Sequence, residues 1–501
     1  MLNINQNTYN TYLGQKGYTI LKKDLSNIEQ EHLKKELTAK PYTPGTPGGG
    51  AGNSFPVYRE SGNKFYVPRY FGEATYGVTK DMRIPEGNDI DIKFEGELRD
   101  NQKPVVKTFL DKIDNTGGGL LELPCAMGKT VIGLNIISEL KKKTLIIVHK
   151  EFLLNQWIER IQQFLPTARV GRIQGQIMDI ENKDIVIGML QSLSMKDYHE
   201  NTFQSFGLTI IDEVHHISSE VFSCALFKIV TKHTLGLSAT MNRKDGTTKV
   251  FKLFLGEIVF KGTRDEEHDV IVRAIEYTSN DAEFKMVATD FRGNVQYSTM
   301  ISKLCVFNHR SEFILRVLKD MIGENPNQQI MILAHNRNLL TYFHDAIQSR
   351  NIASVGYYVG GMKETALKET ESKQVIIATY SMAAEGLDIK TLTSLIMATP
   401  KTDIEQAVGR ILRVRHGNPI IVDIIDEHQP FKNQWIKRKA FYKKQNYKII
   451  QTSNAEYTAD VSMWKNEYAA KKVGKCLIKL KKPVTSEINI VSRALGAEIL
   501  H

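Results

Sequence analysis

The chain has 501 residues, which is too long for one small domain and leaves room for about three domains of ordinary size. Hydrophobic residues make up 42% of the chain and charged residues 24%, a composition that excludes a globally disordered protein. Lysine and arginine number 66 against 56 aspartate and glutamate residues, and the net charge of +10 favours a polyanionic partner.

The cysteines and the apolar runs indicate in which cellular compartment the protein is expected. The cysteines lie too far apart in the sequence for zinc-ligand spacing or a disulfide framework: Cys125, Cys224, Cys305 and Cys476. The first residues are too polar for a secretory signal, and no apolar run approaches the roughly 20 residues of a membrane helix. We therefore expect a soluble intracellular protein with reduced thiols and no membrane association.

Residues 1–95 differ in composition from the rest, and we expect a small accessory region there. A charged helical stretch at 24–40 leads into a segment at 41–53 so rich in proline and glycine that it can hold neither a helix nor an interior strand. Aromatic and basic residues then alternate from Phe55 to Phe71. They form either the core of a small β-rich unit or a surface on which nucleic-acid bases stack, and the sequence leaves both open.

From about residue 96, short β-branched runs alternate with helical patterns. This rhythm is typical of a parallel sheet that is covered by helices on both faces. It lapses at 263–300 and then returns. The expected strands are 145–148, 184–188, 208–211, 234–238, 330–333, 374–377, 394–397 and 420–422.

The predicted fold class is therefore α/β. It comprises two tandem doubly wound parallel-sheet domains, a small N-terminal accessory domain and a basic C-terminal extension. We place the accessory region at 1–95, the two α/β domains at 96–262 and 263–450, and the extension at 451–501.

A phosphate-binding loop is expected where Gly128, Lys129 and Thr130 open a helix after a strand and a loop. Backbone N–H groups at such a helix start can cradle phosphate oxygens, and the helix dipole favours their negative charge. Lys129 can neutralise the β- and γ-phosphates of a nucleotide, and the Thr130 hydroxyl can bind Mg²⁺. Leu123 stands where the strict pattern has glycine.

Two adjacent carboxylates, Asp212 and Glu213, follow the apolar run 208–211. In a doubly wound sheet, ligands bind beyond the carboxyl ends of the strands, which is where this pair emerges. Asp212 suits a role in holding Mg²⁺. Glu213 suits the orientation and polarisation of a water molecule that attacks the γ-phosphate.

These segments resemble, in chain order, the motifs of superfamily 2 helicases. Segments 98–102, 129–130, 212–215, 238–240, 378–388 and 406–413 resemble the adenine-reading segment and motifs I, II, III, V and VI. The resemblance implies two RecA-like domains, ATP and Mg²⁺ as cofactors, and nucleic acid as the partner.

Motif VI leads to an expectation about how the two domains move. Gln406, Gly409, Arg410 and Arg413 are spaced to share one helical face, and two guanidinium groups there suit arginine fingers that reach a γ-phosphate across a cleft. If the phosphate loop lies in one domain and the arginines in the other, only closure of the two domains completes the site. Hydrolysis then drives relative domain motion.

The site residues that the motifs and the resemblance imply fall into four groups. The catalytic set is Lys129, Asp212, Glu213, Gln406, Arg410 and Arg413, and the Mg²⁺ ligands are Thr130 and Asp212. The nucleotide-binding set is Arg99, Gln102, Pro124, Cys125, Ala126, Met127, Gly128, Lys129, Thr130, Gly386 and Asp388. The set for nucleic-acid contact or coupling is His215, Ser238, Thr240, Arg243 and Thr379.

Two segments indicate which kind of superfamily 2 helicase the chain resembles. Residues 124–130 and 236–245 are similar to the phosphate loop and extended motif III of the xeroderma-pigmentosum group B type of DNA helicase, with Ala126 in place of glycine and Lys244 in place of glutamate. The chain also resembles the poxvirus-type transcript-release helicases of large DNA viruses. The resemblance implies a 3′ to 5′ ATP-dependent DNA helicase or translocase in transcript release, transcription termination or repair.

Other interpretations stay open. An RNA helicase is the main alternative, and a nucleic-acid-binding module without hydrolysis is a third. We expect a monomer that works with the transcription machinery, in the host cytoplasm and its virus factories and in the virion if the source is viral. Residues 430–501 hold 15 basic and 5 acidic side chains, which are either a solvated face or a phosphate contact.

Overall fold

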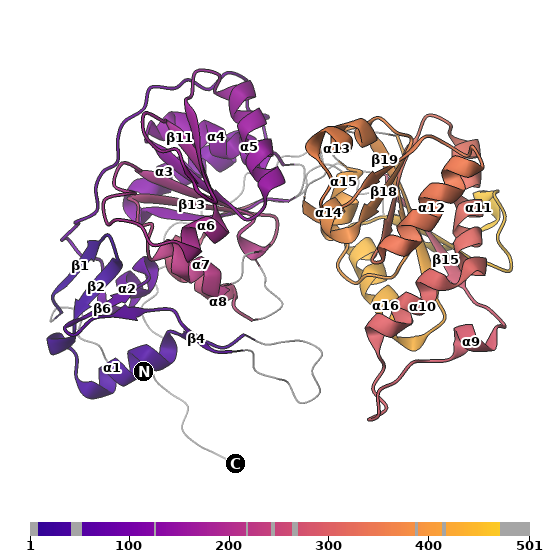
Figure 1. Cartoon of the computed structure of the whole chain (residues 1–501), viewed down its shortest axis with the longest axis horizontal. Coiled ribbons are helices and arrows are strands. Elements are labelled where there is room, and N and C mark those ends of the chain that lie inside the picture. Colours follow the sequence, from indigo (N-terminus) through magenta and orange to yellow (C-terminus); the bar gives the residue numbers. More distant parts are fainter. Residues whose placement is uncertain are drawn as a thin grey trace, which may run out of the picture.

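The computed structural model describes residues 9–41, 53–124, 127–216, 219–241, 246–262, 269–385, 389–412 and 417–470. Figure 1 shows three parts: an N-terminal unit (residues 9–76), a first lobe built on one eight-stranded sheet, and a second lobe built on another. The N-terminal unit lies against the first lobe.

The N-terminal unit is a small antiparallel sheet in the order β1-β2-β6-β5 with two helices. Its helix α1 begins at a capping box, in which Ser26 and Glu29 bond reciprocally to each other's backbone N–H groups. The elements are β1 (Thr11–Gly14), β2 (Gly17–Leu21), η1 (Lys22–Asp24), α1 (Asn27–Glu36), β3 (Thr38–Ala39), β4 (Phe55–Pro56), β5 (Arg59–Glu60), β6 (Lys64–Val67) and α2 (Arg69–Tyr76).

The aromatic residues of this unit mostly form its core. Tyr18 and Phe65 are fully buried and Phe71 is 6% exposed, whereas Tyr66 points to the opposite face of strand β6 and is half-buried. The unit is tied to the first lobe by Arg59, whose Nη2 donates to the Cys224 carbonyl at 3.3 Å. Of the two interpretations of the Phe55–Phe71 segment, the core accounts for the fully buried rings.

The first lobe has the sheet order β10-β9-β11-β8-β12-β13-β7-β14, parallel except for the β9–β10 pair. Strands β8 and β12 are buried along their whole length because helices cover both faces. The elements are α3 (Lys103–Thr116), β7 (Gly118–Glu122), α4 (Lys129–Leu140), β8 (Thr144–Val148), α5 (Glu151–Phe164), β9 (Val170–Gln174), β10 (Ile177–Met178), β11 (Ile185–Met189), α6 (Leu190–Met195), β12 (Leu208–Asp212), η2 (Val214–His216), α7 (Ser219–Leu226), β13 (His233–Ser238), α8 (Thr248–Leu255) and β14 (Ile258–Lys261).

The second lobe has the order β17-β18-β16-β19-β20-β15-β21-β22, parallel except for β21–β22. Its elements are β15 (Ile271–Tyr277), α9 (Ala282–Lys285), α10 (Tyr297–Val306), α11 (Asn308–Glu324), β16 (Gln329–Ala334), α12 (Arg337–Ser349), β17 (Val355–Tyr358), α13 (Glu364–Glu371), β18 (Val375–Thr379), α14 (Tyr380–Glu385), β19 (Leu392–Met397), α15 (Glu405–Arg410), β20 (Ile420–Asp426), α16 (Gln429–Lys444), β21 (Lys448–Ser453), η3 (Val461–Met463) and β22 (Lys465–Tyr468).

Two sequence expectations need correction here. Strand β15 lies inside the segment 263–300, where the sequence pattern predicts no strand, and it pairs with both β20 and β21. The boundary placed at residue 450 falls inside strand β21, because that strand and β22 complete the second sheet. Residues 451–468 are therefore part of the second lobe rather than an extension from it.

The basic run near the C-terminus is also partly structural. Arg438 is 1% exposed and donates from Nε and Nη2 to the two carboxylate oxygens of Asp423, each at 2.8 Å. Lys439 pairs with Glu467 of β22. These two side chains stabilise the second lobe, and neither is a free charge for a phosphate.

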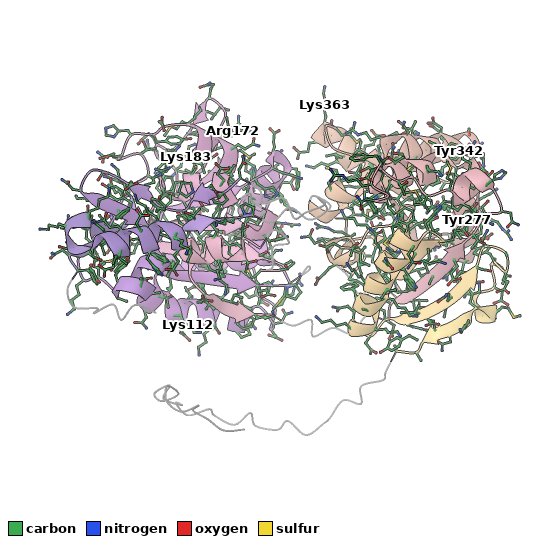
Figure 2. All side chains as sticks on the ribbon, turned by 90° about the horizontal axis from the view of Figure 1, so that it is seen from below. Lys112, Arg172, Lys183, Tyr277, Tyr342 and Lys363 are labelled. Carbon is green, nitrogen blue, oxygen red and sulfur yellow. The ribbon has the colours of Figure 1, made fainter. Side chains whose placement is uncertain are left out.

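The lobes contact each other through side chains as well as through the connecting chain. On one side, Asn155 of α5 donates to Glu364 of α13 at 2.9 Å, and Glu159 of α5 pairs with Lys368 of α13 at 2.7 Å. Figure 1 shows α5 facing α13 across the two lobes. Figure 2, seen from below, shows Lys363, directly before α13, projecting from the end of the second lobe that is nearest the first lobe.

None of the helices in the described part of the chain combines the length and the apolar character needed to cross a membrane.

Candidate ATP site and nucleic-acid interface

The loop that we expect to bind phosphate ends at a residue that has to be glycine. Gly128 has φ +76° and caps the start of α4, and a Cβ on it would lie 2.4 Å from the Nε2 of Gln102. Gln102 is 2% exposed and donates from Nε2 to the Met127 carbonyl at 2.9 Å, while its Oε1 accepts from the Arg99 backbone N–H. Gln102 therefore braces the loop from behind, and Arg99 lies at the surface nearby.

The acidic pair sits at the carboxyl end of β12, as the sequence predicts. Glu213 has φ +49°, a left-handed conformation that is unfavourable for a residue with a Cβ, and its N–H donates to Oδ1 of Asp212 at 2.9 Å. Trp157 of α5 donates from its indole Nε1 to Oδ2 of Asp212 at 2.9 Å. Both oxygens of Asp212 are therefore held in fixed positions.

Burial changes the acidity of Asp212. Its side chain is 6% exposed, and this burial, together with the charge of Glu213, raises its pKa to about 6. Lys129 opposes the rise, because its ammonium group favours nearby negative charge. A bound divalent cation would favour the ionised carboxylate in the same way.

Lys129 and Glu213 form an ion pair. Nζ of Lys129, at the first position of α4, lies 2.6 Å from Oε1 of Glu213, and both side chains are mostly buried. The two residues that we expect on either side of a γ-phosphate are thus in direct contact. They come together because β7 and β12 end at the same edge of the parallel sheet.

A chain of hydrogen bonds leads from this edge into the second lobe. The hydroxyl of Ser238 donates to the Thr240 carbonyl at 2.6 Å, so its oxygen accepts from Nδ1–H of His215 at 2.5 Å. The His215 Nε2 is then an acceptor, and Nε2 of Gln406 in the second lobe lies 2.9 Å away as donor. His215 also lies 3.5 Å from Glu213.

The second-lobe residues are only partly arranged as expected. Helix α15 ends at Arg410, so only Gln406, Gly409 and Arg410 of the predicted helical face lie on it. Nε of Arg410 donates to the Ala383 carbonyl of α14 at 2.7 Å, which connects motifs V and VI within this lobe. Thr379 lies at the end of β18, with its hydroxyl 3.3 Å from that of Ser381.

Several expected residues lie outside the described part of the chain: Cys125, Ala126, Arg243, Gly386, Asp388 and Arg413. Among the described ones, the structure brings together Lys129, Asp212, Glu213, His215, Ser238, Thr240 and Gln406. Pro124, Met127 and Thr130 lie on the same loop and helix start.

Sequence reasoning missed Trp157, which orients Asp212. Its place in the apolar pattern of α5 predicts only a core residue. A buried indole N–H must find an acceptor, but no local pattern says that the acceptor is 55 residues away. Gly133 of α4 makes room for the ring, because a Cβ there would lie 3.1 Å from Cη2 of Trp157.

Comparison with known proteins identifies the family. Residues 95–243 match the family described as type III restriction enzyme, res subunit, and residues 314–417 match the helicase conserved C-terminal domain. A protein of Acanthamoeba polyphaga mimivirus, named as a candidate ATP-dependent RNA helicase, is 33% identical over 93% of this chain and 92% of its own. The chain belongs to the superfamily 2 helicases.

Further matches agree. A candidate ATP-dependent RNA helicase of African swine fever virus is 30% identical to this helicase over 72% of the chain and 76% of its own. Saccharomyces cerevisiae Dbp5 bound to RNA and ADP-BeF₃ is 12% identical over 71% of this chain and 90% of its own, with a TM-score of 0.50, which supports the tandem RecA-like fold. The helicase hydrolyses ATP and binds nucleic acid, and it has relatives among the large DNA viruses.

Proposed function

We propose that this helicase is a DNA-stimulated ATPase that moves 3′ to 5′ and separates DNA strands. Its proposed setting is viral transcription termination, transcript release or repair. The observation that carries the motor part of the proposal is the connection from Lys129 through Glu213 and His215 to Gln406 in the other lobe. It joins the phosphate loop to the lobe that has to move.

The residues present fit ATP with Mg²⁺. The start of α4 offers backbone N–H groups behind a left-handed glycine, and Asp212 and Thr130 supply the carboxylate and hydroxyl oxygens that Mg²⁺ prefers. When bound, the cation neutralises charge on the phosphates. Arg99, Gln102, Pro124, Cys125, Ala126, Met127, Gly386 and Asp388 complete the proposed nucleotide contacts.

Hydrolysis requires the Lys129–Glu213 pair to separate. Phosphate oxygens compete for the Lys129 ammonium, because they carry more negative charge than one carboxylate. Glu213 is then released to accept a hydrogen bond from the attacking water. The pair thus holds both side chains in position between turnovers.

Motion follows from groups contributed by the second lobe. Arg410 and Arg413 are the proposed arginine fingers, and Gln406 reports the state of the phosphate site through His215. Because Arg410 also bonds to α14, a movement of Arg410 toward the γ-phosphate would be passed to the Thr379 end of β18. Thr379, Ser238, Thr240 and Arg243 are the proposed strand contacts or couplers, and contacts to the backbone of the strand would be independent of its sequence.

The preference for DNA rests on the resemblance of residues 124–130 and 236–245 to the xeroderma-pigmentosum group B type. An RNA helicase is the second candidate, because the mimivirus and African swine fever virus relatives carry that name. The test measures ATP turnover with single-stranded DNA and with RNA of matched sequence. Stronger stimulation by DNA supports the proposal, and stimulation by RNA alone overturns it.

Strand displacement on duplexes with a single 3′ or 5′ overhang then tests polarity. We expect displacement only with the 3′ overhang. The proposal also includes a monomeric motor that engages the transcription machinery in the host cytoplasm and is carried in the virion. Co-purification with a viral RNA polymerase from infected cells would test that setting.

A further inference from the structure

A hairpin on the second lobe presents an aromatic ring to solvent. Figure 1 shows the segment between α9 and α10 projecting from the lobe. At its tip, Phe291 is 91% exposed, and the guanidinium of the neighbouring Arg292 lies 5.0 Å from the centre of the Phe291 ring. Full burial of a phenylalanine side chain is worth about 2–3 kcal/mol, so the exposed ring is an unused source of binding energy.

The tip is held rigidly. Residues 288–296 form a hairpin: the N–H of Gln296 donates to the Ala288 carbonyl, and Thr289 bridges to Val295. The Asp290 carboxylate accepts from the N–H groups of Arg292 and Asn294, each at 2.8 Å, and from the Asn294 amide at 3.1 Å. The ring is thus presented by an ordered turn, which limits the conformational entropy lost when it binds.

Both ends of the hairpin are anchored in the lobe. On one side Phe284 is 2% exposed, and on the other Met300 is fully buried. Nζ of Lys303 donates to the carbonyls of Glu283 and Met286 and so holds the entry to the hairpin against α10. A force on the tip is therefore passed to the body of the second lobe.

Two hydrogen bonds connect the root of the hairpin to the end of β18, where the proposed strand contact Thr379 lies. The Tyr297 hydroxyl donates to the Pro400 carbonyl at 3.2 Å. The Tyr380 hydroxyl donates to the carbonyl of Thr399, which directly precedes Pro400. Tyr380 directly follows Thr379, one of the proposed strand contacts. One short segment, 399–400, therefore joins the hairpin to the end of β18.

The composition of the tip favours nucleic acid over a protein partner. At the tip, Phe291 is followed by Arg292, Gly293 and Asn294, whereas the other exposed apolar side chains of this region, among them Met286, Val287 and Val295, lie at the base of the hairpin. A single exposed ring beside a guanidinium suits stacking on a base and contact with a phosphate. The Asp290 oxygens accept hydrogen bonds within the turn.

We propose that the 288–296 hairpin is a strand-separation element, in which Phe291 stacks on the base pair at the duplex junction and Arg292 contacts the adjacent phosphate. This inference rests on the proposed function, since it needs a strand in the groove beside Thr379. It adds a contact that no helicase motif of the chain supplies.

The test compares F291A, F291W and M195A in the full-length protein. Met195 is the matched control, because it is an apolar side chain 84% exposed on the first lobe. We expect F291A to slow displacement from a forked duplex about tenfold, within the range for loss of one base–aromatic stack, and F291W to restore it. ATP turnover on single-stranded DNA should stay within about twofold of wild type in all three variants, because turnover needs no stacking at a junction.

A second measurement separates this inference from the proposed function. The helicase has three tryptophans, all buried, so added fluorescence in F291W reports the tip. Quenching by a forked duplex that exceeds that of the wild type supports the proposal, even if turnover fails. Equal quenching in both proteins, or displacement by F291A at the wild-type rate, overturns it.

Discussion

Gln406 of the second lobe donates a hydrogen bond from Nε2 to Nε2 of His215 in the first lobe, over 2.9 Å. The His215 ring is oriented from its other side by Ser238, which is fully buried. A displacement of either lobe of about 1 Å would break such a bond. The two residues are therefore expected to sense the separation of the lobes at the edge of the proposed phosphate site.

Loss of this contact should uncouple ATP turnover from the binding of nucleic acid. We expect Q406A and H215A each to reduce the stimulation of ATP turnover by nucleic acid about tenfold. The double variant should be no worse than H215A alone, because the contact that Q406A removes is already lost in H215A. A double-mutant cycle on stimulated turnover measures the coupling. N155A, which removes an inter-lobe contact at α13, is the control and should keep its stimulation. Additive losses would show that the two residues act separately.

Glu213→Gln should abolish turnover while the nucleotide still binds. The amide keeps the size of the side chain but cannot polarise water as a carboxylate does, so we expect a fall of about 100-fold or more in turnover. ATP affinity should be unchanged or higher, because one negative charge near the phosphates is removed. Titration with a fluorescent nucleotide and steady-state turnover check both. A variant that hydrolyses at the wild-type rate would show that Glu213 does not have this role.

Trp157→Phe should weaken the site through the position of Asp212. The ring packing is kept while the 2.9 Å indole hydrogen bond to the carboxylate is lost. We expect the Mg²⁺ concentration for half-maximal turnover to rise about threefold to tenfold, in line with other residues that orient metal ligands, while turnover at saturating Mg²⁺ stays close to wild type. An unchanged Mg²⁺ requirement would contradict this positioning role.

The sequence predicts the fold and the local motifs better than the long-range contacts. The strands ending at Asp212 and Ser238 are predictable because a buried parallel strand is a continuous apolar run. Strand β15 is not, since Arg273 and Glu276 interrupt its apolar pattern and its place in the sheet depends on β20 and β21. Nor does local spacing reveal Trp157 or the end of α15 at Arg410, because both depend on tertiary packing.

Arg310→Ala should destabilise the second lobe. Arg310 and Asp426 are both fully buried, and Arg310 donates to the two carboxylate oxygens at 2.6 and 2.8 Å and to the Ala398 carbonyl. Removal of one partner leaves a buried charge uncompensated, which costs about 3–5 kcal/mol. Two of the three tryptophans, Trp435 and Trp464, lie in this lobe, so urea unfolding in a W157F background reports it.

The control for that change removes both charges. The double variant R310M/D426L places apolar groups of similar volume in the same space, and we expect it to recover most of the stability lost in R310A. If R310A unfolds at the wild-type urea concentration, the ion pair does not stabilise the lobe.

His233 should make the first lobe less stable in mild acid. It is 6% exposed at the start of β13, and burial, assisted by the neighbouring charge of Lys232, lowers its pKa from 6.5 to about 4. The unfolded chain therefore binds a proton on this residue near pH 6.5, whereas the folded chain does not bind it until about pH 4. The stabilising contribution is complete above pH 6.5 and is lost as the pH falls from 6.5 to 4, by about 3 kcal/mol in total.

Urea unfolding at pH 7.5, 5.5 and 4.5 measures how steeply the free energy of unfolding depends on pH. His233→Asn should be less stable at pH 7.5, but its free energy of unfolding should depend less steeply on pH over this interval. The carboxylates titrate in both proteins, so their contribution cancels when one curve is subtracted from the other. Parallel curves would mean that His233 does not carry the acid sensitivity.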